Sequence, residues 1–146
     1  MTTTNKNVDW AHAQAVLDVF HRYAWGYDSN DMESMGAAFA EDGVTSGVIT
    51  NSNNGWGPWK GRGEIIAGLQ AIHDSQNDQR RHQITTPMFV SLSSDEAVLK
   101  AYLSCFATPP GGQPSLVTTG EYLAYLSCKN SVWQIDRLDV VLDGDF

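Results

Sequence analysis

Apolar residues in the first part of the chain recur with helical spacing. From residue 10 to residue 27 they fall every three or four positions, which predicts a helix with one buried stripe. The polar segment 28–31 breaks this pattern and places Asp28 at the helix end. Asn30 and Glu33 have the spacing of a capping box, which predicts a second helix directly afterwards.

Three further elements are expected before residue 80. The Glu-Asp-Gly segment 41–43 is predicted to end the second helix, and the β-rich segment 44–50 to form a short strand. Residues 51–63, rich in Asn, Gly and Trp, predict a loop. Apolar spacing over residues 64–73 predicts a third helix.

The second half of the chain has the composition of strands. Residues that are β-branched, aromatic or Leu concentrate in four runs separated by turn signals: 82–92, 97–107, 116–127 and 132–142. Helices followed by a mainly antiparallel sheet indicate an α+β fold. In such a fold the helices cover one face of a curved sheet, and a pocket is expected between the two layers.

Length and composition indicate how the chain is organised into domains. A chain of 146 residues with 42% hydrophobic and 18% charged residues is typical of one globular domain. We expect residues 1–7 to form a disordered N-terminal tail and residues 8–146 to form the domain.

Charge and cysteine content exclude several classes of protein. A formal net charge of -8 opposes binding to nucleic acid or to an anionic membrane surface. No apolar run reaches the roughly 18–20 residues of a membrane span, and the first seven residues lack the apolar core of a secretory signal, so a cytoplasmic location is expected. Cys105 and Cys128 have no metal-site spacing, and Cys105 is expected to face a residue near 118 in a hairpin rather than Cys128.

Five short segments carry a resemblance to a known family. They are YAWGYDSND at 23–31, FAEDG at 39–43, GRG at 61–63, RH at 81–82, and GEY at 120–122 ahead of WQI at 133–135. Together they resemble the SnoaL-like group of the nuclear transport factor 2-like superfamily, whose enzymes include scytalone dehydratase, hexachlorocyclohexane dehydrochlorinase, ketosteroid isomerase and polyketide cyclases. The resemblance spans about Val8 to Val141 and implies a cone-shaped α+β barrel, with three N-terminal helices packed on a curved, mainly antiparallel sheet.

The resemblance also implies a catalytic pair. In the dehydratase branch an aspartate at the end of the first helix meets a histidine of the sheet, and Asp28 and His82 match these positions. Strand alternation places His82 on the same face as Ile84 and Met88, so the imidazole is expected to point inward. A buried aspartate beside an imidazole fixes its tautomer and makes the other ring nitrogen a general base. The alternative is a histidine packed in the core and an aspartate that caps a helix.

Tyrosines and other aromatic residues complete the predicted site. Tyr27 matches a Tyr-Asp pair of scytalone dehydratase and would hydrogen-bond the substrate oxygen, although its place on the buried helix stripe equally fits a core residue. Other side chains are expected to line the pocket and bind substrate; two of them, Trp56 and Trp59, equally fit ordinary loop packing. These residues are Tyr23, Trp56, Trp59, Met88, Tyr102 and Phe106.

The resemblance is incomplete in two places. The chain has no histidine after His82, whereas scytalone dehydratase has a second pocket histidine. Ala124 stands where polyketide cyclases carry an acid, and only Glu121 is available nearby as a substitute. We therefore expect a cofactor-independent, metal-free lyase or isomerase of the dehydratase or cyclase type, acting on a small hydrophobic carbonyl compound such as a polyketide, terpenoid or aromatic intermediate.

Two other functions remain open from the sequence. One is a non-catalytic ligand-binding or assembly subunit of the same fold, for which a wide separation of Asp28 and His82 would be the sign. The other is an epoxide hydrolase of the limonene type, which needs an arginine, namely Arg62, Arg81 or Arg137, beside Asp28. A homodimer or homotrimer is expected in either case, formed through an exposed sheet face that carries Leu99, Leu103 and Leu123.

Overall fold

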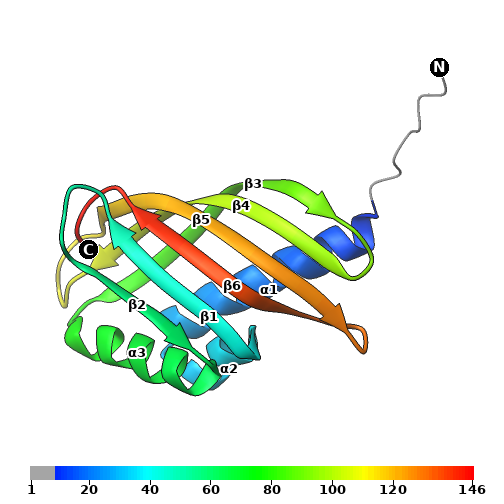
Figure 1. Cartoon of the computed structure of the whole chain (residues 1–146). Coiled ribbons are helices and arrows are strands. Elements are labelled where there is room, and N and C mark those ends of the chain that lie inside the picture. The colour runs from blue at the N-terminus through cyan, green and yellow to red at the C-terminus, as the bar shows by residue number, and fades with distance from the viewer. Residues whose placement is uncertain (1–8) are drawn as a thin grey trace.

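A curved six-stranded sheet wraps around the helices of this protein (Figure 1). The computed structural model describes residues 9–146, so the predicted tail at residues 1–7 lies outside the described residues. The sheet order is β2-β1-β6-β5-β4-β3, and all neighbours are antiparallel except β1 and β6. The elements, in chain order, are α1 (Trp10–Asp28), α2 (Met32–Ala37), β1 (Phe39–Ile49), β2 (Gly55–Lys60), α3 (Arg62–Ser75), β3 (Gln79–Leu92), β4 (Glu96–Thr108), β5 (Ser115–Lys129) and β6 (Val132–Leu142).

The predicted α+β class is confirmed. The helices lie within residues 10–75 and pack on one face of the sheet, while the last four strands form a continuous antiparallel meander. Helix α1 contacts β3 and β6, and α3 contacts β1 and β2, so the helices close the concave side of a sheet that is not closed on itself. In the part of the chain that the structure describes, no helix combines the length and apolar character of a membrane span.

Helix α1 follows the predicted stripe closely. Asp9 caps its N-terminus by accepting hydrogen bonds from the backbone N–H groups of Ala11 and His12. The helix ends at Asp28, where the Ser29 backbone N–H bonds to the carbonyl of Trp25. The predicted helix end is therefore confirmed, and it places a carboxylate at the base of the concave face.

The second helix is shorter than predicted. It ends at Ala37, and Phe39 begins β1 instead of closing the helix, so the segment 41–43 lies inside a strand. Parallel pairing with β6 explains this, because Phe39 stands opposite Ile135 and the Ala38 carbonyl accepts the Ile135 N–H. The predicted capping box is also wrong: Asp31 is the N-cap and accepts from the Ser34 N–H.

The predicted loop at 51–63 contains the edge strand β2. This strand pairs with β1, and the Trp56 ring lies over Gly47, where an added Cβ would come within 2.2 Å of the ring. Because Gly47 has no side chain, the Trp56 ring can pack directly against its backbone.

A bulge in β3 changes which of its side chains face inward. Thr86 has a φ of 54°, and the register with β4 shifts between Thr85 and Met88. Arg80, His82 and Ile84 alternate on the concave side, but Met88 beyond the bulge is 52% exposed. The expectation that Met88 shares the inward face of His82 is therefore wrong.

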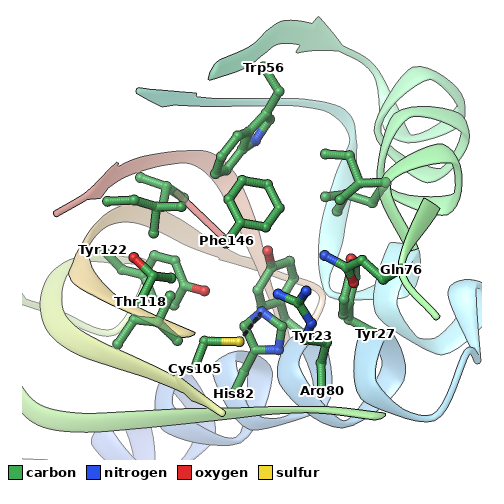
Figure 2. A pocket seen from close by; sticks show the side chains of 15 residues that line it. Tyr23, Tyr27, Trp56, Gln76, Arg80, His82, Cys105, Thr118, Tyr122 and Phe146 are labelled. Atoms are coloured by element: carbon green, nitrogen blue, oxygen red, sulfur yellow. Dashed lines mark hydrogen bonds between the residues drawn. The ribbon is translucent and has the colours of Figure 1, made fainter. Parts of the chain in front are cut away.

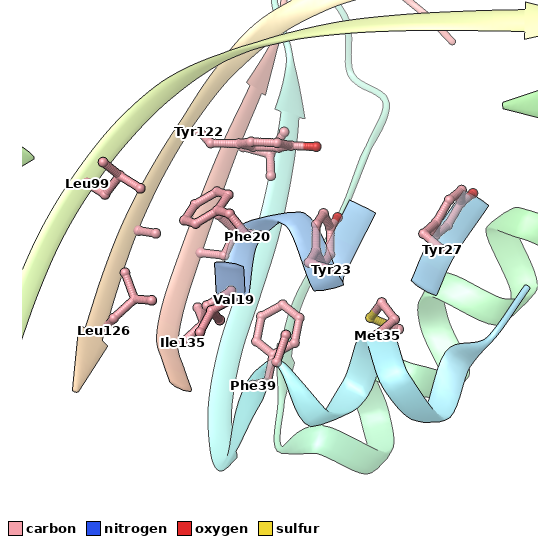
Figure 3. Close-up of a cluster of buried hydrophobic side chains, with 14 of the residues drawn as sticks. Val19, Phe20, Tyr23, Tyr27, Met35, Phe39, Leu99, Tyr122, Leu126 and Ile135 are labelled. Atoms are coloured by element: carbon pink, nitrogen blue, oxygen red, sulfur yellow. The ribbon is translucent and has the colours of Figure 1, made fainter. Parts of the chain in front are cut away.

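The hydrophobic core lies between α1, α2 and the central strands (Figure 3). The rings of Phe20 and Tyr122 approach to 5.9 Å between centroids, as do those of Tyr23 and Phe39. Full burial of each large apolar side chain contributes roughly 1.5–3 kcal/mol to stability. The largest fully buried side chains are Phe20, Phe39, Met35, Ile65, Leu99, Ile135, Leu138 and Val16.

The outer face of the sheet differs from the prediction. Leu99 and Leu103 are buried on the concave side, so they cannot form the expected contact between sheets of two copies. Of the three predicted leucines, Leu123 does project outward, together with Tyr102, Tyr125 and Val141. Assembly into a homodimer or homotrimer stays a prediction.

Candidate active site

A cavity opens between the concave face of the sheet and helices α1 and α3 (Figure 2). The cavity itself holds about 40 Å³, and the open space at its mouth brings the total to about 440 Å³. Its lining combines aliphatic side chains of α3, β4 and β6 with a few polar groups from α1, β3 and β5, which is the composition of a small-molecule site.

Asp28 and His82 form a hydrogen-bonded pair in which His82 lines this cavity and Asp28 lies behind it. The distance from Asp28 Oδ1 to His82 Nδ1 is 2.6 Å, and the other carboxylate oxygen accepts the His82 backbone N–H at 2.7 Å. The end of α1 is further tied to β3 by Gln79, whose amide donates to the Asp28 carbonyl. The expectation from the sequence that these two side chains are in contact is confirmed.

The environment of His82 favours its charged form. Burial opposes a charge on the ring, but the hydrogen bond to Asp28 and the nearby Cys105 outweigh burial and raise the pKa of His82 to about 9. The carboxylate can only accept, so Nδ1 carries a proton and Nε2 is the nitrogen available for chemistry. Nε2 lies 3.9 Å from Cys105 Sγ, and both residues line the cavity.

Three tyrosines stand around the pair. The Tyr27 ring contacts the His82 ring edge-on at 5.1 Å, and its hydroxyl donates to Gln76 Oε1 at 2.9 Å. The rings of Tyr23 and Tyr122 meet edge-on at 6.1 Å. Burial raises the pKa of Tyr23 to about 12 and moves the pKa of the other two further upward, so all three phenols stay protonated and able to donate at neutral pH.

Two aromatic rings stand opposite the pair across the cavity. Trp56 of β2 and Phe146 meet edge-on with centroids 5.7 Å apart (Figure 2). The segment after β6 is held there because Thr118 donates to the Gly144 carbonyl and Thr119 to the Asp143 carboxylate. Any ligand in the cavity therefore contacts flat apolar surface on this side.

Comparison with known proteins shows the family of the chain. The model of the SnoaL-like domain matches residues 10–139. The chain belongs to the SnoaL-like family. The resemblance drawn from the short sequence segments is thereby confirmed, and the cavity described above is that of a SnoaL-like domain.

Solved structures share this SnoaL-like fold. An NTF2-like protein with a cystatin-like fold from Novosphingobium aromaticivorans superimposes with a TM-score of 0.76 at 18% identity, covering 91% of this chain and 82% of the other. A candidate scytalone dehydratase of the same organism gives 0.74 at 17% identity, with 91% and 85% covered. The β subunit of a candidate aromatic-ring-hydroxylating dioxygenase, also from that organism, gives 0.75 at 15% identity, with 94% and 92% covered. No curated protein matches the chain by sequence.

Some predicted pocket residues of this SnoaL-like domain lie elsewhere. Tyr23, Tyr27 and Trp56 line the cavity as expected. Trp59 instead packs against Gly68 of α3, and Tyr102 is 55% exposed on the outer face of β4.

The face of β4 explains two of the misplaced residues. Cys105 points inward and stands opposite Thr118 as expected, so Phe106 and Tyr102 point away from the cavity. Both faces of β4 carry apolar side chains, so the sequence does not show which face is the inner one. The prediction that Tyr102 and Phe106 lie inside is wrong.

Sequence analysis missed several residues of the cavity. Gln76 and Arg80 lie just before the predicted start of the strand at 82, where polar residues suggest a surface loop. Tyr122 and Thr118 belong to the inner face of β5, which strand alternation could have identified. Phe146 follows the last strand and gave no signal in the sequence.

The arginines named for an epoxide hydrolase do not line the cavity. Arg62 donates to the Phe39 carbonyl, and Arg137 pairs with Asp139. Arg81 lines a second depression, between α1 and β3, and Asp28 and His82 line the same depression, so Arg81 is the one of the three arginines that shares a pocket with Asp28. Among residues 9–146 no group of three or more His, Cys, Asp or Glu side chains is arranged to hold a metal ion.

Proposed function

We propose that this protein is a cofactor-independent lyase or isomerase in which His82, oriented by Asp28, acts as the general base. The 2.6 Å contact between Asp28 Oδ1 and His82 Nδ1 carries the proposal, because it leaves Nε2 toward a largely apolar cavity. The aromatic lining supports a small hydrophobic substrate with a carbonyl group, such as a polyketide, terpenoid or aromatic intermediate.

The proposed chemistry begins with removal of a proton next to the substrate carbonyl. Nε2 of neutral His82 takes the proton, and the electrons of the broken C–H bond move into the carbonyl to give an enolate. In a dehydration, the enolate expels a hydroxyl group from the β-carbon, and the His82 imidazolium returns the proton so that water leaves. In an isomerisation, the same proton is returned to a different carbon. In a cyclisation, the enolate carbon attacks a second carbonyl, and the His82 imidazolium protonates the alkoxide that forms.

A phenol would stabilise the enolate oxygen. Tyr27 and Tyr23 both line the cavity close to His82, and burial keeps both phenols protonated. A hydrogen bond donated to the oxygen strengthens as negative charge develops there, which lowers the barrier. Tyr27 would have to exchange its present acceptor, Gln76, for the substrate oxygen.

The raised pKa of His82 sets the pH dependence of this reaction. With a pKa of about 9, roughly one His82 ring in a hundred is neutral at pH 7 in the free protein. The second-order rate constant kcat/KM for proton abstraction is therefore expected to rise about tenfold per pH unit from pH 6 toward pH 9 and then level off.

Proton exchange tests the proposal without knowledge of the natural substrate. Small aromatic and alicyclic ketones that bind the protein, as detected by ligand NMR, are incubated with it in D2O, and loss of the α-proton signal is followed. We expect wild-type protein to accelerate exchange, and His82→Gln to lower this acceleration by a factor on the order of 100 to 10,000. His21→Gln, on the exposed side of α1, is the matched control and should exchange like wild type.

The same measurement separates the competing functions. Ketones that bind without any exchange above that of His82→Gln would overturn the proposal and favour a ligand-binding or assembly subunit, the class to which the dioxygenase β subunit with this fold belongs. In such a subunit Asp28 and His82 are expected to lie far apart, whereas here they are within hydrogen-bond distance. Hydrolysis of an epoxide in place of exchange would favour the epoxide hydrolase.

A further inference from the structure

Arg80 brings a second positive charge into the cavity beside His82. The two residues alternate on β3, so both side chains rise from the strand on its concave side (Figure 2). Arg80 is only 8% exposed, although arginine is among the residues least often buried. Such a position needs a physical reason.

The hydrogen bonds of Arg80 use only part of its guanidinium group. Nε donates to Asp78 Oδ1 at 2.6 Å, and Nη2 donates to Asp78 Oδ2 at 3.3 Å. Asp78 thereby holds one edge of the planar group in a fixed orientation. Nη1, on the other edge, is buried and has no hydrogen-bond partner among residues 9–146.

An unpartnered buried donor on a charged group is costly, and a ligand atom that accepts from it removes that cost. The polar side chains nearest to this part of the lining have partners already, because the Tyr27 hydroxyl donates to Gln76 and the Thr118 hydroxyl to the Gly144 carbonyl. Arg80 Nη1 is thus a donor of the cavity left for a ligand, in addition to His82 Nε2 and the Tyr23 phenol that the proposed reaction uses.

We propose that Arg80 Nη1 binds an anionic oxygen of the ligand. The substrate is then a hydrophobic carbonyl compound of one of two kinds: it carries a carboxylate that Arg80 binds, or it reacts through an enolate whose oxygen Arg80 binds. The inference rests on the proposed function for the cavity that holds the ligand and, in the case of an enolate, for the reaction that forms it. A guanidinium stays charged at every relevant pH and can donate a hydrogen bond either to a carboxylate oxygen or to an enolate oxygen. Apart from Gln76, His82 and Thr118 the remaining lining is apolar or aromatic, so the contact with Arg80 would fix the orientation of an otherwise hydrophobic ligand.

Binding of benzoate and benzamide tests this proposal independently of catalysis. The two probes have the same shape and differ in the charge of one oxygen-bearing group, and their dissociation constants are measured by NMR titration at pH 7. We expect wild-type protein to bind benzoate at least about tenfold more tightly than benzamide. Arg80→Gln should reduce this preference to about twofold or less. Arg81→Gln removes the same charge from the neighbouring exposed residue of β3 and should keep the preference.

Two results would overturn the proposal. One is equal affinity of wild-type protein for both probes, which needs no variant and so remains decisive if Arg80→Gln fails to fold. The other is a preference that survives in Arg80→Gln and disappears in His82→Gln, because the anion would then bind the imidazolium. Ketone exchange without a benzoate preference would reject the Arg80 site alone, whereas a benzoate preference without exchange would reject the catalytic proposal alone.

Kinetics of ketone exchange distinguish the two sources of the anionic oxygen. If the oxygen belongs to a carboxylate that does not react, Arg80→Gln raises KM for keto acids about tenfold and leaves kcat unchanged. If it is the enolate oxygen, Arg80→Gln lowers kcat for simple ketones instead. Unchanged kcat and KM for both groups of compounds would contradict the proposal.

Discussion

The carboxylate of Asp28 holds His82 at two points, one oxygen on the backbone N–H and the other on the ring nitrogen Nδ1. The end of helix α1 and the start of β3 are thereby locked to each other, and the imidazole orientation is fixed by the same group that supports its charge. This double contact can be tested by changing the carboxylate into an amide of the same shape.

Asp28→Asn should disable the proposed base while leaving its position intact. If the Asn oxygen keeps the backbone N–H, its NH2 group faces Nδ1, which must then accept, and the ring proton moves to Nε2. We expect ketone exchange to fall by a factor on the order of 100 to 10,000. The pKa of His82, measured by NMR titration of its ring protons, should fall from about 9 toward its ordinary value.

The control for this variant is Asp31→Asn. Asp31 caps α2 and is exposed, and asparagine caps helices equally well, so neither exchange nor the His82 titration should change. A His82 pKa that stays near 9 in Asp28→Asn would show that Asp28 is not the group that supports the charge.

The stability of the protein should depend on pH through His82. Its pKa is raised from 6.5 to about 9 on folding, so the protonated ring stabilises the folded state fully below pH 6.5. This contribution, about 3 kcal/mol, is lost as the pH rises from 6.5 through 9. Urea unfolding of wild type and His82→Gln at pH 6 and pH 9.5 measures it: the difference in free energy of unfolding should shrink at the higher pH. A difference that stays constant would mean that His82 does not titrate between these values.

The two tyrosines nearest to His82 should differ in their effect on catalysis. The Tyr27 hydroxyl already donates to Gln76, whereas Tyr23 stands edge-on to Tyr122 with its ring facing the cavity. We expect Tyr23→Phe to lower kcat for ketone exchange more than Tyr27→Phe. Tyr27→Phe should instead lower the free energy of unfolding by about 1 kcal/mol through loss of its hydrogen bond. The opposite order of the two kcat values would identify Tyr27 as the donor to the enolate oxygen.

Gly26 controls the position of the catalytic aspartate two residues later. A Cβ at this position would come within 2.6 Å of the Met35 backbone nitrogen, so Gly26→Ala must push α1 and α2 apart. We expect a loss of roughly 1–3 kcal/mol in the free energy of unfolding, measured in urea, together with a lower exchange rate. Gly63→Ala in α3 is the matched control: an added Cβ meets nothing within 4 Å, so stability should be unchanged or slightly increased. Equal effects of the two substitutions would contradict this account of the α1–α2 contact.

The elements that the sequence predicted well have a local cause. The stripe of α1 and the four last strands depend on residue spacing and on side-chain preferences within about a dozen residues, and both survive into the folded protein. The juxtaposition of Asp28 and His82, 54 positions apart, has no such local signal and was expected only from the resemblance to the SnoaL-like group. The predicted end of α2 is wrong because a distant contact decides it: pairing of Phe39 with Ile135, nearly a hundred residues away, outweighs the helical spacing.

For this protein, the sequence by itself determined the α+β class, most of the strands and the placement of a carboxylate at the end of the first helix. The tertiary structure alone decided which side chains share the cavity. A strand pattern of period two has two phases, and only its neighbours and the bulge at Thr86 select the one that buries Cys105 and exposes Tyr102 and Met88. The same holds for Arg80, because a single arginine in a sequence gives no sign of whether burial will leave one of its donors without a partner.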